Sequence, residues 1–224
     1  MKKLILIFIF FITVNLNAFP IPKNKKVSFD IIRKNKTIGS VTTDFNIEGN
    51  KLIMDTVVDI KVKILLFPAY KFHQNTKEIW INEEFVEIDG YTDFEDEREY
   101  FIKGKDIEKN FVASGMDGEL KLDKEIIPLN YWNKKILDES ELFDTQKGIV
   151  RQVTVKKIGN ETLKINKKKI LTEKYTLDAS KNPKDKGPFP TYTIWYKGDE
   201  LIKFEFINWK DKKKITTVRN DLNY

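Results

Sequence analysis

The sequence offers few side chains that could act as a base or a nucleophile. Its 224 residues include one histidine, His73, and no cysteine. The histidine alternates out of phase with the aromatic residues of its segment, so we expect it on the surface or rim of the fold. The chain has no glycine-rich phosphate loop, no Gly-x-Ser-x-Gly elbow and no Cys-x-x-Cys pair. We therefore expect a non-enzymatic protein with no catalytic residues, no metal site and no cofactor.

One carboxyl group stands out by its position. In a strand, alternate residues share a face, and Glu78 then lies on the same face as Tyr70, Phe72 and Trp80. If this face lines a concavity, burial raises the pKa of the carboxyl, and the group could anchor a ligand head group or act as an acid. The other interpretation, which we favour on sequence alone, is a structural glutamate paired with a lysine from a neighbouring strand.

Aromatic residues could build a pocket around this carboxyl, although aromatic residues at strand spacing more commonly form plain core. The candidate ligand-binding residues are Tyr70, Phe72, Glu78, Trp80, Tyr131, Trp132, Trp195 and Tyr196. The acidic run from Asp93 to Glu99 lacks the spacing of a calcium loop and contains Arg98, so it is interpreted as a solvated turn.

The elements that would position these residues are strands. After Pro22, apolar and polar residues alternate with period two, most clearly from Val58 to Leu66, and turn residues interrupt the pattern every eight to fifteen residues. The predicted hairpin turns are Gly49-Asn50, Asn82-Glu83, Lys103-Gly104, Asp117-Gly118, Gly159-Asn160, Asn166-Lys167 and Gly198-Asp199.

Two segments depart from this pattern. Residues 130–143 suit a short helix of one or two turns, and residues 180–190 contain three prolines and predict an exposed loop. The fold class is therefore mainly β: eleven or so strands in one antiparallel meander. A sheet of that width must curve strongly into a half-barrel or barrel. Its concave face is then filled by its own side chains, by the helix or by a ligand.

The N-terminus predicts export. Lys2 and Lys3 precede an apolar run from Leu4 to Val14, and the small residue Ala18 follows at a suitable cleavage point, as in a secretory signal peptide. We predict a signal peptide over residues 1–18, one β-rich domain over residues 19–224, a periplasmic location, and no membrane span after cleavage. The formal net charge is +6, with lysine runs interleaved with acidic segments. Nucleic acid is not an expected partner.

Several short motifs resemble a family of exported bacterial proteins known as domain of unknown function 6134. They are Ile38-Gly39, Glu78-Ile79-Trp80, Pro128 with Tyr131-Trp132-Asn133, Gly148, and Trp195-Tyr196. This family looks distantly similar to the lipoprotein carriers, in which a curved antiparallel sheet wraps a helical element and holds an acyl chain. The resemblance implies a half-barrel and, by analogy, an apolar ligand. The chain departs from the carriers in having one short helix candidate.

The first hypothesis is a periplasmic module that binds a lipid or other apolar small molecule on a concave face. The alternative is a structural or interaction protein of the cell envelope with a filled core, whose edge strand pairs with a protein partner. An outer-membrane barrel ranks below both, because several expected strands are shorter than a membrane requires. A hydrolase ranks last, because no nucleophile and base occur at a recognisable spacing.

Overall fold

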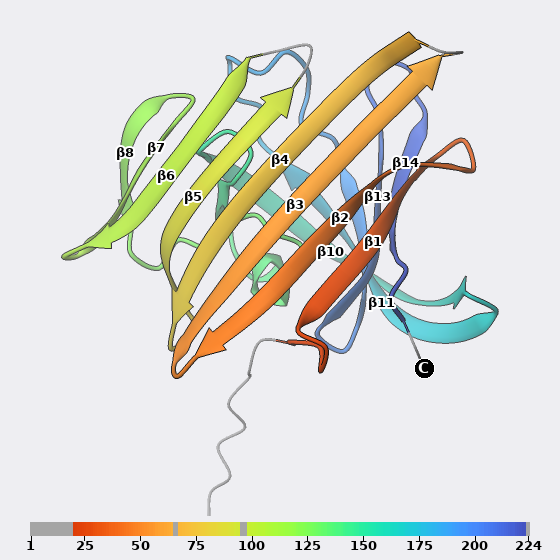
Figure 1. Ribbon diagram of the computed structural model, residues 1–224, viewed down its shortest axis with the longest axis horizontal. Coiled ribbons are helices and arrows are strands. Elements are labelled where there is room, and N and C mark those ends of the chain that lie inside the picture. The colour runs from red at the N-terminus through yellow and green to blue at the C-terminus, as the bar shows by residue number, and fades with distance from the viewer. Residues whose placement is uncertain (1–19, 65–66, 95–97, 223–224) are drawn as a thin grey trace, which may run out of the picture.

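The computed structural model describes residues 20–64, 67–94 and 98–222, so the predicted signal peptide lies outside the described residues. These residues form one antiparallel sheet of fourteen strands and a single turn of 3₁₀-helix (Figure 1). The first eight strands are β1 Lys26–Arg33, β2 Lys36–Glu48, β3 Lys51–Ile64, β4 Phe67–Ile81, β5 Glu84–Phe94, β6 Glu99–Ile107, β7 Asn110–Gly115 and β8 Gly118–Asp123. The helical turn η1 and the remaining strands are η1 Lys134–Leu137, β9 Glu141–Asp144, β10 Ile149–Ile165, β11 Lys168–Ala179, β12 Tyr192–Lys197, β13 Glu200–Ile207 and β14 Lys214–Arg219.

The strand order makes the sheet almost cyclic. The order is β8-β7-β6-β5-β4-β3-β2-β1-β14-β13-β12-β11-β10-β9. Each strand therefore pairs with its neighbours in the sequence, and the first strand pairs with the last, with Ile31 opposite Thr217. The one consecutive pair of described strands without a shared ladder is β8 and β9. The sheet is consequently curled like a barrel but is not closed.

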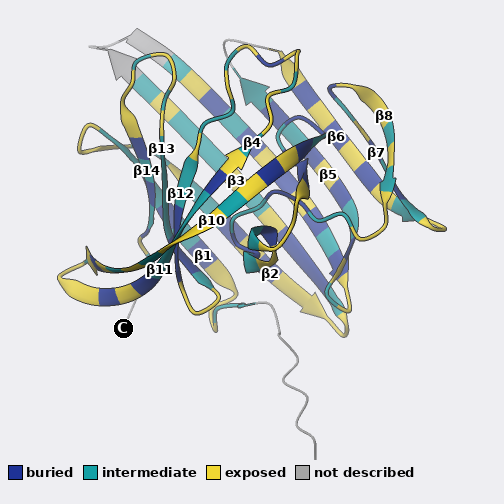
Figure 2. Ribbon diagram, turned by 180° about the vertical axis from the view of Figure 1, so that it is seen from behind, coloured by how far each residue is buried: buried dark blue, intermediate teal, exposed yellow. Residues whose placement is uncertain are grey.

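The chain crosses this gap between β8 and β9 through residues 124–140. The start of the crossing segment covers the edge of β9, because the Phe143 backbone NH donates to the Ile127 carbonyl (2.9 Å) and the Leu129 NH donates to the Phe143 carbonyl (2.8 Å). Farther along, Ile136 in η1 is fully buried. Figures 1 and 2 show η1 inside the curve of the sheet, near its lower end. The crossing segment therefore plugs one end of the incomplete barrel.

Two glycines bring the two sides of the gap together. The turn after β7 meets the turn before β10, where the Met116 NH donates to the Lys147 carbonyl (2.7 Å). A Cβ atom on Gly115 would lie 2.5 Å from the Cα of Gly148, and a Cβ on Gly148 would lie 2.7 Å from the Cα of Gly115. Backbones can approach this closely only where neither residue has a side chain.

Most of the local structure follows the sequence pattern. Val27, Phe29 and Ile31 alternate with more exposed neighbours along β1, and Figure 2 shows the same banding on the wide strands. Asn82-Glu83 and Asn166-Lys167 have positive φ at both residues, as a two-residue hairpin turn with the right-handed twist of its strands requires. The predicted turns at Gly49-Asn50 and Gly198-Asp199 are confirmed as well. The turn predicted at Asp117-Gly118 lies one residue earlier, at Met116-Asp117.

Two predicted turns are wrong. Gly104 lies inside β6, where a Cβ would sit 2.6 Å from the Phe111 ring, so this glycine makes room for an aromatic side chain. Gly159 lies inside β10 beside a bulge at Ile158, where the ladder with β11 shifts register. Glycine within a strand has both of these uses besides turns.

The helix expected over residues 130–143 is shorter than its range. Only Lys134–Leu137 are helical, and they form a 3₁₀ turn that begins after Asn133, whose side chain accepts a hydrogen bond from the Lys135 NH. Residues 141–144 form β9 instead, so the acidic and apolar residues there belong to a strand. The proline-rich segment, residues 180–190, is outside the strands as predicted.

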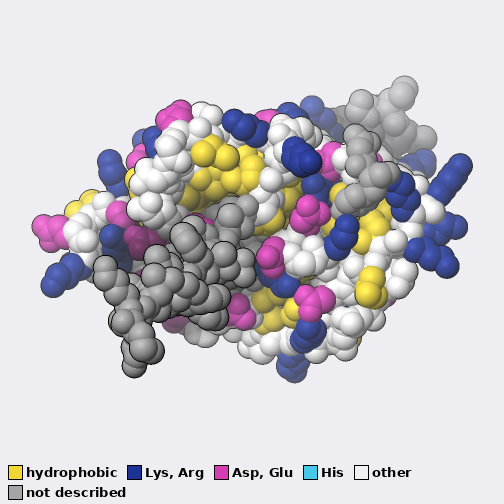
Figure 3. Space-filling view, turned by 90° about the horizontal axis from the view of Figure 1, so that it is seen from below, with side chains coloured by type: hydrophobic (Ala, Val, Ile, Leu, Met, Phe, Trp, Pro, Cys, Tyr) yellow, Lys and Arg dark blue, Asp and Glu magenta, His cyan; other side chains and the backbone are white. Residues whose placement is uncertain are grey.

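The core has a main part and a smaller satellite. The main cluster lies inside the curve of the sheet and includes Trp80, Phe111, Phe143 and Tyr196. The satellite packs around Trp195, with Leu163, Ile170, Ile202 and Leu222. On the face seen in Figure 3, basic and acidic side chains are interspersed around apolar ones. No helix in the described part of the chain is long and apolar enough to span a membrane.

The glycine contact across the gap can be tested with a matched pair of substitutions. Gly148 and Gly49 have nearly the same positive φ, +65° and +64°, but a Cβ on Gly49 meets nothing within 4 Å. Gly49→Ala should lower the free energy of unfolding by about 1–2 kcal/mol, because it adds only backbone strain. Gly148→Ala should cost about 3 kcal/mol or more, because the two backbones must also separate. Urea unfolding measures both values, and equal losses would refute the role of this contact.

Candidate functional site

A cavity occupies the interior of the curled sheet above the crossing segment. Its volume is about 770 Å³, within the range of small-molecule sites. Strands β1 to β4 form one wall, β12 to β14 form the opposite wall, and the loops at residues 185–190 and 207–211 border it. Residues Lys186, Trp209 and Lys210 at these loops are exposed, whereas Met54 and Trp132 at the other end are buried. The cavity therefore has a mouth at the loops and a floor at the crossing segment.

Strand register makes the wall near the mouth apolar. Ile60 pairs with Phe72, Val62 pairs with Tyr70, and Phe72 pairs with Phe94 in the next strand. Because paired residues point to the same face, these side chains form continuous rows across β3, β4 and β5. The Phe72 and Phe94 rings meet edge to face with centroids 4.9 Å apart. Apolar ligand atoms could lie against this surface.

Deeper in the cavity the same strands present hydroxyl and amide groups. Thr43, Thr56 and Thr76 stand side by side in one row across β2, β3 and β4. The Thr43 and Thr56 hydroxyls lie 2.9 Å apart. The Gln74 amide donates to Thr76 Oγ1 (3.2 Å) and to the Thr145 carbonyl (3.4 Å). We call Thr43, Thr56, Thr76 and Gln74 the polar belt. Most donors of this belt are already engaged within the protein.

Glu78 lies one alternate position below the belt and is 3% exposed. Its Oε2 accepts hydrogen bonds from the Trp80 indole NH (3.1 Å) and the Asn130 side-chain amide (2.7 Å). The Asn133 backbone NH donates to Asn130 Oδ1 (3.0 Å), which orients the Asn130 amide so that its NH₂ group faces the carboxyl. Strand β4 and the crossing segment thus hold this carboxyl from two sides.

Glu78 has no cationic partner among the described residues. The structure therefore corrects the expectation that a lysine from a neighbouring strand pairs with it. Burial raises the pKa of Glu78 to about 7, and the hydrogen bonds from Trp80 and Asn130 lower it only in part. A carboxyl group with this pKa is present in both protonation states near neutral pH.

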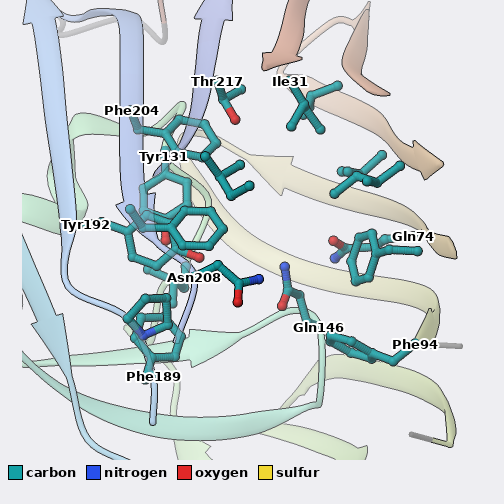
Figure 4. Close-up of a pocket in the computed structure, with 18 of the residues that line it drawn as sticks. Ile31, Gln74, Phe94, Tyr131, Gln146, Phe189, Tyr192, Phe204, Asn208 and Thr217 are labelled. Carbon is teal, nitrogen blue, oxygen red and sulfur yellow. The ribbon is translucent and has the colours of Figure 1, made fainter. Parts of the chain in front are cut away.

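The opposite wall is an aromatic stack. The Tyr131 ring, from the crossing segment, stacks on Phe204 (centroids 4.7 Å apart) and contacts Tyr192 (4.9 Å), which in turn contacts Phe189 (5.5 Å). The Tyr196 hydroxyl donates to the Tyr131 carbonyl (2.6 Å) and fixes this residue to β12. Figure 4 shows these rings on one side of the cavity and Gln74 and Phe94 on the other. Burial raises the pKa of Tyr192 to about 12, so its phenol is neutral.

A buried ionic cluster forms the side of the cavity beside β10. Arg151 Nε donates to Asp144 Oδ2 (2.6 Å), Arg151 Nη1 donates to Asp185 Oδ2 (2.9 Å), and Lys147 Nζ donates to Asp185 Oδ1 (3.0 Å). Burial raises the pKa of Asp185, but the hydrogen bonds from Arg151, the Asn182 backbone NH and Lys147 outweigh it and lower the pKa to about 2. The cluster contains two acids and two bases. It ties the loop at residues 180–190 to β10.

The mouth is bordered by contacts between loops. A Cβ on Gly187 would lie 2.3 Å from the Trp209 ring, so glycine allows the indole to lie directly on this loop. Arg33, the last residue of β1, forms an ion pair with Asp211, in the turn after β13. Figure 4 shows the Asn208 and Gln146 side chains pointing toward each other within the cavity. Access to the cavity thus depends on the residue 207–211 turn.

The comparisons with known proteins identify the family and support the fold. The model of a domain of unknown function, DUF6134, matches residues 29–220. The chain belongs to this family. No curated protein matches it. A crystal structure of a beta-barrel-like protein of domain of unknown function DUF1849 from Brucella abortus is similar, with a TM-score of 0.61 and 13% identity over 88% of this chain and 96% of that one. At this identity the likeness concerns the fold alone.

The structure of this DUF6134 member brings together five of the eight residues that the sequence suggested. Tyr70, Phe72, Glu78, Tyr131 and Trp132 line the cavity. The other three residues lie elsewhere. Trp80 is buried beneath the floor against Phe85, Tyr196 is main core, and Trp195 belongs to the satellite cluster, where Lys203 lies over its ring. His73 lies in β4 but outside the cavity lining; it is partly buried, and its Nδ1 lies 2.9 Å from Oδ1 of Asp59 in β3.

Sequence reasoning missed the polar belt and the ionic cluster. Thr43, Thr56 and Gln74 follow the inward alternation of their strands, so the pattern placed them on the concave face without marking them as a row. Arg151 and Asp185 belong to a strand and to the proline-rich loop, and no local signal connects them. The acidic segment Asp93–Glu99 lies partly outside the described residues, which end at residue 94 and resume at residue 98.

The raised pKa of Glu78 predicts that stability falls as the pH rises. Between about pH 4.5 and 7 the folded protein holds the proton while the unfolded chain releases it, so ionisation costs up to about 3 kcal/mol of folding free energy. Glu78→Gln keeps an acceptor for Trp80 and Asn130 but cannot ionise. Between pH 5 and pH 8, the free energy of unfolding measured with urea should fall less in Glu78→Gln than in the wild type. Identical losses in both proteins would contradict the assignment.

The ionic cluster predicts a large cost for removing its central cation. Arg151→Met leaves Asp144 and Asp185 buried without their main partner, which should cost about 3–5 kcal/mol. Lys26→Met breaks an exposed pair with Asp44 and should cost about 1 kcal/mol or less. Denaturant unfolding of the two variants at pH 7 measures the difference. A loss at Arg151 no larger than at Lys26 would show that the cluster does not hold the loop.

Proposed function

We propose that this protein is a non-enzymatic module that binds a lipid or other apolar small molecule in the cavity inside its curled sheet. The observation that carries the proposal is the cavity itself, with apolar rows near an exposed mouth and a plugged floor. An apolar ligand that moves from water to such walls gains about 25 cal/mol for each Å² of apolar surface buried. A protein that needed only a stable core would fill this space, because cavities destabilise.

The proposal includes export. A signal peptide over residues 1–18 would deliver the domain to the periplasm, where an apolar molecule needs a carrier or a receptor to stay out of water. The absence of cysteine from the sequence suits a bacterial envelope better than a eukaryotic secretory route. His73, the single histidine, lies outside the cavity lining, so the cavity offers no imidazole base. This arrangement supports binding over hydrolysis.

The second candidate is an interaction protein of the envelope. Strand β8 is the end of the sheet order and pairs only with β7 among the described strands, so its other edge could add a strand from a partner. This strand has six residues, and three of them are charged: Glu119, Lys121 and Asp123. Short, charged edge strands discourage pairing. We therefore rank this candidate below ligand binding.

The first experiment compares native and denatured masses of protein purified from its producing cells. A non-covalent adduct that a solvent extract identifies as an apolar molecule would support the binding module. A clean mass, together with a specific crosslink to another envelope protein through β8, would favour the interaction protein instead.

Filling the cavity should abolish binding without changing the outer surface. Val58 points into the cavity and its neighbour Val57 is 40% exposed on the outer face. Val58→Trp should weaken binding of the apolar fluorophore N-phenylnaphthylamine at least about tenfold, which corresponds to about 1.4 kcal/mol. Val57→Trp adds the same side chain outside the cavity and should leave the affinity unchanged. Circular dichroism checks the fold of both variants, and equal affinities would place the binding site elsewhere.

A further inference from the structure

The floor of the cavity has an open hydrogen-bond acceptor. Both donors that reach Glu78, from Trp80 and Asn130, end on Oε2. Among the described residues no donor reaches Oε1, and this atom is not fully enclosed by protein atoms. Glu78 is part of the cavity lining, so its free oxygen faces the cavity. An acceptor in this position is a recognition element for any molecule that reaches the floor.

Most donors near the floor already have a partner, and the Trp132 indole NH, which has none among the described residues, is enclosed by protein atoms. The free oxygen of Glu78 is therefore the main polar group of the floor that is open to a ligand. The Asn130 NH₂ group and the Trp80 indole both bond to Glu78, and the Gln74 amide bonds to Thr76 and Thr145. The Thr43 and Thr56 hydroxyls bond to each other. A buried acceptor without a donor loses its hydration and gains nothing in return. A ligand that donates a hydrogen bond relieves this cost, whereas one that brings only acceptors does not.

The order of the walls determines which end of a ligand goes in first. The cavity-facing positions of β4, from the mouth down, are Tyr70, Phe72, Gln74, Thr76 and Glu78. Along β4 the lining therefore changes from aromatic near the mouth to polar near the floor. A chain whose polar end reaches Glu78 places its apolar part against Phe72 and Ile60.

We propose that the ligand is an amphipathic molecule that enters head first and donates a hydrogen bond from a hydroxyl or amino group to the free Oε1 of Glu78. This inference rests on the proposed function, since it specifies the ligand class of the same cavity. Burial keeps the pKa of Glu78 near 7, so a donor or a cation also stabilises the ionised form that the apolar surroundings disfavour. Above pH 7, where Glu78 is ionised and Oε1 can only accept, fatty carboxylates and esters, which bring only acceptors, bind less well.

The test uses four probes with the same alkyl chain: dodecanol, dodecylamine, dodecanoate and methyl dodecanoate. Titration calorimetry on the full mature chain at pH 8.5, where Glu78 is ionised, and below the micelle concentration of each probe gives the four affinities. The alcohol and the amine should bind at least about tenfold more tightly than the acid and the ester, the factor expected when a buried polar group gains a partner.

Two variants of Glu78 separate recognition from folding. Glu78→Leu removes the acceptor and frees the donors of Trp80 and Asn130, so the preference for the alcohol and the amine should disappear. Glu78→Gln can turn its NH₂ group toward the cavity while its oxygen still accepts from Trp80 and Asn130, so the preference should invert in favour of the acid and the ester. Lys77→Leu, at an exposed position on the same strand, is the matched control and should keep the wild-type order.

The outcomes distinguish this inference from the function on which it rests. A preference for donors that inverts in Glu78→Gln supports head-first recognition by Glu78. Equal binding of all four probes, or an order that the Glu78 variants do not change, overturns this inference and leaves the apolar binding function standing. Failure of all four probes to bind the wild type overturns both.

Discussion

The pairing of β1 with β14 is the constraint on which the architecture depends. Because the first and last strands share a ladder, the break in the cyclic strand order falls in the middle of the chain, between β8 and β9. The chain must then cross from one free edge to the other. It crosses through the interior, where residues 124–140 contact β9 and bury Ile136. The open side of the barrel and the plug at its floor are thus consequences of one topological choice.

The crossing segment also supplies part of the site that it closes. Asn130 donates to Glu78, and Tyr131 stacks against β13. The wall strands set the depth of each group by their regular rise. From Tyr70 to Glu78 the strand advances about 26 Å at about 3.3 Å per residue, and alternate residues face the cavity throughout. Strands β2 to β5 are paired without interruption. Residues at the same depth on neighbouring strands therefore form rows of similar chemical character.

The sequence determined the local features better than the distant ones. Alternation in β1 to β5 predicted the strands, and Asn82-Glu83 predicted its turn, because these signals depend on neighbouring residues. Gly104 and Gly159 were misread as turn residues because sequence alone cannot distinguish a glycine that frees φ from one that makes room for Phe111 or flanks a bulge. The helical prediction had the right place but extended over β9, since a four-residue strand carries almost no periodicity.

For the candidate site, the sequence predicted which strand face carries the residues but not which groups they contact. Glu78 could be placed with Tyr70 and Phe72 because one strand carries all three. Its contact with Asn130 spans fifty-two residues and depends on where the crossing segment lies, which no pattern reveals. For the same reason Trp195 was grouped with the pocket aromatics: Ile194 and Tyr196 face inward, but the phase of β12 relative to the cavity is set by its ladder with β13.

The two buried charged features differ in a way that bears on function. In the ionic cluster each carboxylate, of Asp144 and of Asp185, is paired with a cation, and these pairs hold the residue 180–190 loop against β10. A structural role alone accounts for this cluster. Glu78 has two neutral donors on one oxygen and stands in a row with Phe45, Met54 and Ile88. A neutral glutamine would fill the same space and accept the same two hydrogen bonds. Stability does not explain an ionisable group at that position, because burial works against its charge. Groups that carry such a cost are concentrated at functional sites, and a donor delivered to Oε1 from the cavity would offset the cost of burying this carboxyl.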